Sequence, residues 1–149
     1  MKVQLYSSTI RRKEMDAVLS CLVEEKTGPG EVNSRLVQSV KEFFGVSGVV
    51  ALRSPALALK YALKAFQLEK DSKIMISALA PDWQYSAIED LGYVPLVLDV
   101  SPSNALVEVE TIKQGMIEGG KVLLYHETSG LLPNMEEILE LGVPLLEDI

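Results

Sequence analysis

The sequence has few of the residues that build disulfides, metal centres and nucleophilic active sites. Its 149 residues include one cysteine, Cys21, and one histidine, His126. No disulfide can form within one chain, and this count argues against a zinc site. Cys21 lies in an apolar helical stretch, which favours a buried thiol over a nucleophile. Neither Cys21 nor Ser129 lies in the sequence signature of a catalytic nucleophile. His126 alone therefore does not indicate a catalytic triad.

Long apolar runs and basic clusters are also absent. No run approaches the roughly 20 apolar residues of a membrane span, and residues 1–5 lack the apolar core of a signal peptide. The formal net charge is −7, and no basic cluster is longer than Arg11-Arg12-Lys13. This charge argues against nucleic acid and anionic membranes as partners. A reducing cytoplasm is the expected location.

The apolar residues that are present recur with helical spacing at first and in strand-like runs later. In residues 1–45 this predicts two leading helices, separated by the breaker Gly28-Pro29-Gly30. From residue 46 onward helical patterns alternate with short apolar runs, and these runs predict strands at 49–52, 74–76, 95–99, 122–125 and 143–146. Such alternation is typical of a parallel sheet with right-handed crossovers. We therefore expect a single α/β domain over residues 1–149, a three-layer sandwich with a mainly parallel five-stranded sheet.

Several segments carry, in a fixed order, a resemblance to a known family. They are residues 14–19, Gly30, residues 43–46, 50–59, 87–92 and 95–102, His126, and residues 143–148. This order resembles the large domain of the DegT/StrS-type sugar aminotransferases, which are fold-type-I enzymes dependent on pyridoxal phosphate (PLP). The resemblance covers nearly all of this chain, but only the first part of a family member.

The resemblance implies which residues would hold PLP. The cofactor acts as an electron sink when its ring nitrogen is protonated, and a family aspartate that matches Asp148 keeps it so. The PLP phosphate sits at a helix N-terminus, where the family has Ser-Gly-Thr or a similar triplet and this chain has Ser54-Pro55-Ala56. Pro55 removes an N–H donor and Ala56 replaces a hydroxyl residue. Ser54, Ala56 and Asp148 would thus form a vestigial site that does not bind PLP tightly.

Two simpler interpretations stand beside this one. A structural helix with a capping serine and a proline at its first position explains Ser54-Pro55 without any ligand, and Asp148 would then be a solvated acid. The family also stacks an aromatic ring on the cofactor, at the position of Pro81. Trp83 and Tyr85 lie nearby in the sequence, and we expect them to be packing residues instead.

The family's Schiff-base lysine lies beyond the matching aspartate, and no residue follows Ile149. The resemblance therefore implies a truncated or degenerate aminotransferase homologue with no catalytic residue and no transaminase activity as this chain. One alternative is a fragment of an active nucleotide-sugar aminotransferase of amino-sugar or polysaccharide biosynthesis. Another is a non-catalytic binding or assembly module, which would take a small anionic ligand at the carboxyl edge of the sheet, around Ser54, Leu79, Asp99, His126 and Asp148.

The family fold also implies how the predicted strand at 49–52 would behave. In the family this first strand lies across the sheet, so here it would lose its neighbours and leave backbone groups unpaired. It would either move in beside residues 143–146 or be covered by a second chain. Because family members are dimers, we expect a homodimer.

Overall fold

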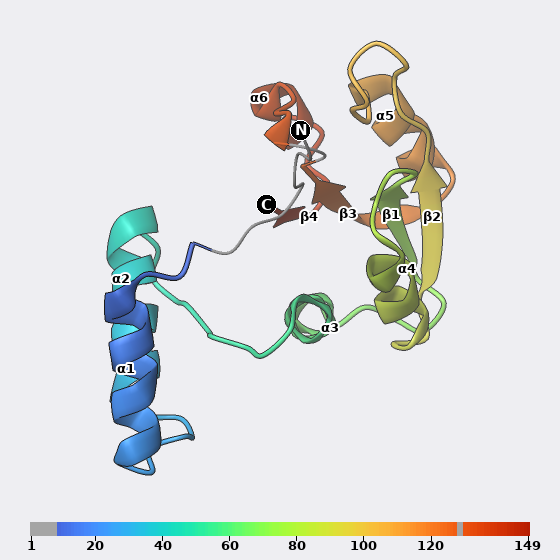
Figure 1. Ribbon diagram of the computed structural model, residues 1–149. Helices are drawn as coiled ribbons and strands as arrows, with labels where there is room; N and C mark the ends of the chain where they lie inside the picture. The colour runs from blue at the N-terminus through green and yellow to red at the C-terminus, as the bar shows by residue number, and fades with distance from the viewer. Residues whose placement is uncertain (1–8, 128–129) are drawn as a thin grey trace. The chain divides into compact units, whose positions relative to one another are not determined.

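The computed structural model describes residues 9–127 and 130–149 (Figure 1). The contacts within the chain divide it into two compact units, Met1–Ala51 and Leu52–Ile149. The expectation of a single domain over residues 1–149 stays a prediction. Ser129 lies outside the described residues.

The first unit contains the two helices predicted from the apolar spacing. Helix α1 (Arg12–Val23) is fixed at its start by Glu14, whose Oε2 accepts a hydrogen bond from the Arg11 N–H at 2.8 Å. Helix α2 (Glu31–Phe44) ends at Gly45, which adopts the left-handed conformation with φ 65°. Glycine takes that conformation without a steric penalty, so the helix ends there. Neither helix has a buried residue.

The second unit alternates helices and strands. It consists of α3 (Pro55–Ala65), β1 (Lys73–Ser77), α4 (Asp82–Glu89), β2 (Val94–Leu98), α5 (Val109–Ile117), β3 (Gly120–His126), α6 (Met135–Leu139) and β4 (Leu145–Asp148). The strands form one sheet in the order β2-β1-β3-β4, and each neighbouring pair is parallel. This confirms the α/β class and the parallel sheet. Among the described residues no helix is both long and apolar enough to cross a membrane.

The prediction of five strands is wrong, because the sheet formed by the described residues has four. Residues 49–52 form no strand, and β4 pairs only with β3 within the described residues. Val50 is 79% exposed and Leu52 is 39% exposed. A short apolar run becomes a strand only when a neighbouring edge pairs with its N–H and C=O groups. Without such an edge, its backbone groups stay open to water.

The core lies on both faces of the sheet, since successive residues of a strand point to opposite sides. Ile74 and Ile76 of β1 pack in a cluster with residues of α3 and α4. Met75, between them, packs in a second cluster with residues of α5 and α6. The helices therefore cover the sheet in two layers. Because all the strands run in one direction, their carboxyl ends meet at one edge of the sheet, where loops can place functional side chains.

Candidate functional site

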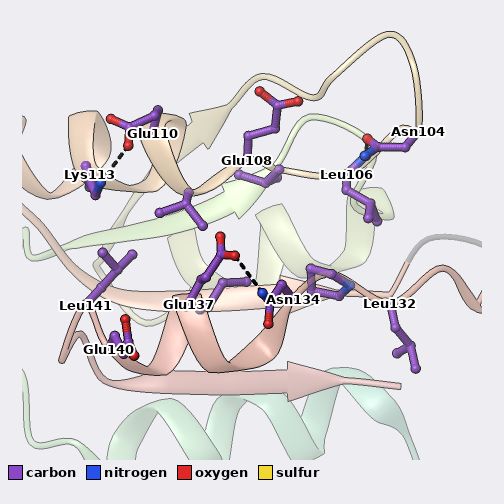
Figure 2. Close-up of a pocket in the computed structure, with 14 residues that line it drawn as sticks. Asn104, Leu106, Glu108, Glu110, Lys113, Leu132, Asn134, Glu137, Glu140 and Leu141 are labelled. Atoms are coloured by element: carbon purple, nitrogen blue, oxygen red, sulfur yellow. Dashed lines mark hydrogen bonds and ion pairs between the residues drawn. The ribbon is translucent and has the colours of Figure 1, made fainter.

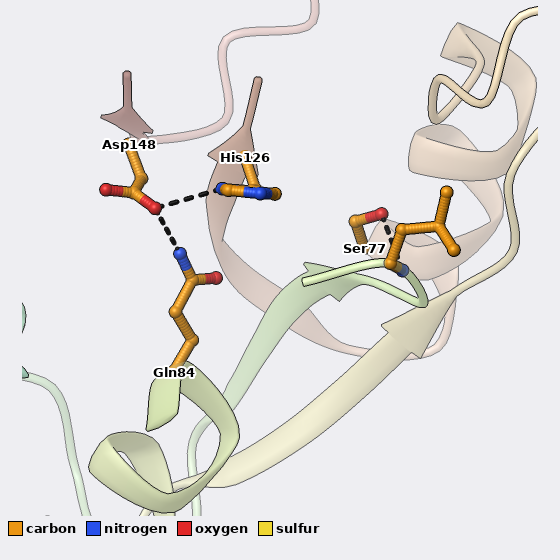
Figure 3. A network of polar contacts seen from close by, with 5 residues as sticks. Ser77, Gln84, His126 and Asp148 are labelled. Carbon is orange, nitrogen blue, oxygen red and sulfur yellow. Dashed lines mark hydrogen bonds and ion pairs between the residues drawn. The ribbon is translucent and has the colours of Figure 1, made fainter. Parts of the chain in front are cut away.

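Three polar side chains meet at the carboxyl edge of the sheet (Figure 3). His126 ends β3 and Asp148 ends β4, and the parallel register places the two residues opposite each other. The Nδ1 atom of His126 lies 3.0 Å from Oδ2 of Asp148. The Nε2 atom of Gln84, from α4, donates a hydrogen bond to the same Oδ2 at 2.5 Å. One carboxylate oxygen is thus held from two different elements.

Gln84 is fully buried, with a relative exposure of 0%. A carboxylate only accepts hydrogen bonds, so the NH₂ group of the amide must face Asp148. The other amide atom, Oε1, is buried and has no hydrogen-bond partner among the described residues. A buried acceptor without a partner costs about 1–3 kcal/mol. A buried glutamine with an unpaired oxygen therefore needs an explanation, and a functional role for its amide would be such an explanation.

The second oxygen of Asp148 is open. Oδ1 makes no hydrogen bond to any described residue, and the side chain is 30% exposed. Asp148 also borders a cavity of about 170 Å³, whose other lining residues are Pro55, Ala58, Leu59, Ala62, Trp83, Gln84, Leu124, Leu146 and Glu147. An apolar cavity of roughly 150 Å³ is large enough for benzene. Asp148, which has one oxygen without a partner among the described residues, therefore borders a largely apolar space about one ring in size.

The N-terminus of α3 contributes Pro55 to this cavity, whereas Ser54 and Ala56 do not line it. The Ser54 Oγ accepts a hydrogen bond from the Leu57 N–H at 3.2 Å, and the Ser54 carbonyl accepts from the Ala58 N–H at 3.1 Å. Pro55 has no N–H. Within the described part of the chain, Ala56 is then the first-turn residue whose N–H has no partner. A helix start normally offers several free donors to an anion, so this one is depleted.

The remaining residues predicted for the carboxyl edge do not join the network. The Asp99 Oδ1 accepts from the N–H of its neighbour Val100 at 2.8 Å, and Leu79 is 47% exposed. Trp83 borders the cavity and packs against the core cluster on the α3 and α4 side, whereas Tyr85 is 41% exposed. No lysine is among the described residues that line the cavity.

Gln84 was missed by the sequence reasoning, although a signal for it exists. Ala87 and Ile88 are buried core residues three and four positions later, so Gln84 lies on the apolar face of α4. A polar residue at a core position is unusual unless it has a partner. The sequence does not show that this partner is Asp148, which is 64 positions away.

A larger hollow of about 740 Å³ lies between the loop after β2, α5 and α6 (Figure 2). Its charged lining is mostly acidic and consists of Glu108, Glu110, Glu137, Glu140 and Lys113. The Lys113 Nζ donates to Glu110 at 2.5 Å, and the Asn134 amide donates to Glu137 at 2.6 Å. Glu108 and Glu140, whose carboxylates have no partner among the described residues, would repel an anion. This hollow therefore does not suit the anionic ligand expected at the edge.

The sequence profile of the DegT/DnrJ/EryC1/StrS aminotransferase family matches residues 8–149. The chain belongs to this family. This confirms the resemblance drawn from the sequence.

Solved structures agree with the fold. The chain is similar to an E. coli GDP-4-keto-6-deoxy-D-mannose-3-dehydratase with bound hydrated PLP, at 23% identity and a TM-score of 0.89, over 97% of this chain and 40% of that one. It is also similar to S. venezuelae DesV in complex with a ketimine intermediate, at 16% identity and a TM-score of 0.80, over 91% of this chain and 38% of that one. This member of the aminotransferase family thus spans about 40% of the length of these solved relatives.

Proposed function

We propose that this chain supplies the ring-nitrogen end of a PLP site, that it binds PLP weakly, and that its 149 residues do not carry out transamination by themselves. The observation that carries the proposal is the arrangement of Asp148. One of its oxygens is held by Gln84 and His126, the other has no partner among the described residues, and the residue borders a ring-sized cavity.

The residues at this end of the cavity fit the cofactor's ring. A protonated ring nitrogen is a hydrogen-bond donor, and Asp148, which borders the apolar space, has in Oδ1 a charged acceptor that no described residue uses. When bound, PLP supplies an electron sink for carbanion chemistry. The part of this chain is to hold the ring and to keep its nitrogen protonated.

The phosphate end fits poorly. Ser54 uses its hydroxyl to cap α3, Pro55 has no N–H, and Ala56 offers a single unpaired backbone donor. A phosphate needs several donors, and positive charge as well, to offset its loss of hydration. This supports weak binding and a role for Ser54 and Ala56 that is at most vestigial.

The lysine distribution supports the absence of transamination. A Schiff base with PLP needs a lysine amine within reach of the cofactor's aldehyde, and the described residues that line the cavity include no lysine. Lys60 lies on α3 but forms an ion pair with Asp90, with 2.5 Å between Nζ and Oδ2.

A PLP titration of the purified chain tests the proposal. The absorbance of PLP is followed during the titration. The sample is then reduced with borohydride and its mass is analysed for a covalent adduct. We expect weak, saturable binding that Asp148→Asn abolishes, with no covalent adduct after reduction. A single stoichiometric adduct would mean that a lysine forms the Schiff base. If the chain binds no PLP at any concentration, PLP is not its ligand and the proposal is wrong.

The share of the solved relatives' length that this chain matches favours a second candidate function. Because this chain matches about 40% of their length, it would be the first part of a nucleotide-sugar aminotransferase that acts in amino-sugar biosynthesis, with its lysine in the remaining part. Sequencing the coding frame beyond Ile149 separates the two candidates. An open frame that encodes an active enzyme would establish the second.

We also propose a homodimer in the cytoplasm. Helix α1 exposes Met15, Val18, Leu19 and Leu22 by 58–61% each, and the outer edge of β4 has no partner strand among the described residues. Exposed apolar faces and open edges favour association. Light scattering after size exclusion measures the mass directly, and a monomer at micromolar concentration would contradict the proposal.

A further inference from the structure

Gln84 places a buried amide on the core side of α4, and only one of its two polar atoms has a partner. The Oε1 atom is paired with no described residue, and the side chain is fully buried. A buried acceptor without a partner destabilises a fold. An amide at this position therefore needs a reason beyond the filling of space.

The reason lies in what the amide NH₂ holds. Asp148 ends β4, at the edge of the sheet, and its side chain is partly exposed. Left alone, the carboxylate would rotate and be hydrated. Donors from α4 and β3 instead meet on one oxygen, Oδ2. Fixing this oxygen from two packed elements also fixes the direction of the other oxygen, Oδ1.

We propose that Gln84 is a positioning residue, which holds Asp148 so that Oδ1 faces a cationic ring N–H of the ligand at the carboxyl edge. The inference rests on the proposed function, in which this ligand is PLP. It makes Gln84 a determinant of specificity, because a fixed acceptor selects a protonated ring over one that has no donor.

Gln84→Met tests this, since methionine has a similar length and no hydrogen-bonding group. The variant is compared with the parent chain in PLP binding and in the binding of an analogue with carbon in place of the ring nitrogen. We expect Gln84→Met to weaken PLP binding about tenfold, as for the loss of a hydrogen bond to a charged group. Binding of the carbon analogue should not change. The ¹⁵N signal of ring-labelled PLP should also shift toward that of the unprotonated ring.

The matched control is Trp83→Phe, because Trp83 lines the same cavity but makes no hydrogen bond to Asp148. Trp83→Phe should weaken the binding of PLP and of the carbon analogue equally, and it should not shift the ¹⁵N signal of the PLP ring. Unfolding in urea should remain cooperative in both variants, so that weaker ligand binding does not come from a loss of folding. Equal weakening of both ligands by Gln84→Met, or unchanged PLP binding, would overturn the inference.

A second measurement needs no ligand and keeps the inference separate from the proposed function. The imidazole ¹⁵N signals of His126 report its bond to Asp148 in the free protein. Gln84→Met should shift them, because the carboxylate loses its second donor and turns. If the parent chain binds no PLP, the proposed function fails, and a shift in these signals still supports the positioning role. Unchanged signals overturn the positioning role whatever PLP does.

Discussion

At the scale of single residues, the described part of the chain has two buried side-chain polar atoms without partners, on opposite faces of the sheet. Gln84 Oε1 belongs to the side of α3 and α4, and the Tyr125 hydroxyl to the side of α5 and α6. The amide of Gln84 also has a partner in Asp148, which gives it a role. The Tyr125 hydroxyl has no such contact within the described residues. Its burial therefore lowers the stability of the fold and serves no visible role.

We therefore expect Tyr125→Phe to stabilise the protein. The substitution removes the unpaired hydroxyl and keeps the ring that packs among the apolar core residues. The free energy of unfolding should rise by about 1 kcal/mol, measured by urea denaturation. Tyr85→Phe, at an exposed position, is the control and should change it little. A clear loss of stability in Tyr125→Phe would mean that the hydroxyl has a partner in solution.

Tyr125 also predicts a dependence of stability on alkaline pH. Burial raises the pKa of its phenol, and the nearby charge of Glu127 raises it further. Above about pH 10, the usual pKa of tyrosine, the unfolded chain loses this proton while the folded chain keeps it. The free energy of unfolding should then fall as pH rises. The difference between the parent chain and Tyr125→Phe, measured by urea unfolding from pH 8 to 11, should widen in favour of the variant. A constant difference would contradict this.

At the scale of elements, the packing of α5 on the sheet depends on two glycines that face Met75. A Cβ on Gly115 would lie 2.7 Å from the Met75 sulfur. A Cβ on Gly120 would lie 2.5 Å from Met75 Cγ and 2.9 Å from the carbonyl oxygen of Gly115. The Met75 side chain fills the space that the missing side chains leave.

Gly120→Ala should consequently destabilise the second unit. The backbone oxygen cannot move away as a side chain can, and overpacking of this kind costs about 1–3 kcal/mol. Gly48→Ala is the control, because nothing lies within 4 Å of the added Cβ. Thermal unfolding of the two variants measures the contrast. Equal melting temperatures would show that the contact relaxes without cost.

At the scale of the whole molecule, the buried core belongs to one of the two units. Both core clusters consist of residues beyond position 52, and α1 and α2 have no buried residue. The second unit therefore contains both core clusters by itself.

We expect residues 52–149 to fold without the first unit, since burial of apolar surface is the main source of stability. Urea unfolding of this shorter chain should remain cooperative. Circular dichroism should show the loss of helix only. A non-cooperative transition would contradict this expectation.

The sequence by itself determined the local elements of this protein. Ser54 and Pro55 mark the start of α3, Gly45 marks the end of α2, and the apolar runs mark β1 to β4, because caps, breakers and hydrophobic spacing act over a few residues. The family pattern also matched Asp148 and His126 to family positions, and any role of theirs with a cofactor stays a prediction.

Only the tertiary structure decided how these elements meet. It left residues 49–52 outside the sheet, because a strand needs a neighbouring edge and no local pattern supplies one. It placed Gln84 of α4 on Asp148 of β4, 64 residues further along the chain. That contact follows from the parallel register and from the packing of α4 on the sheet. Both are properties of the whole unit and of no single segment.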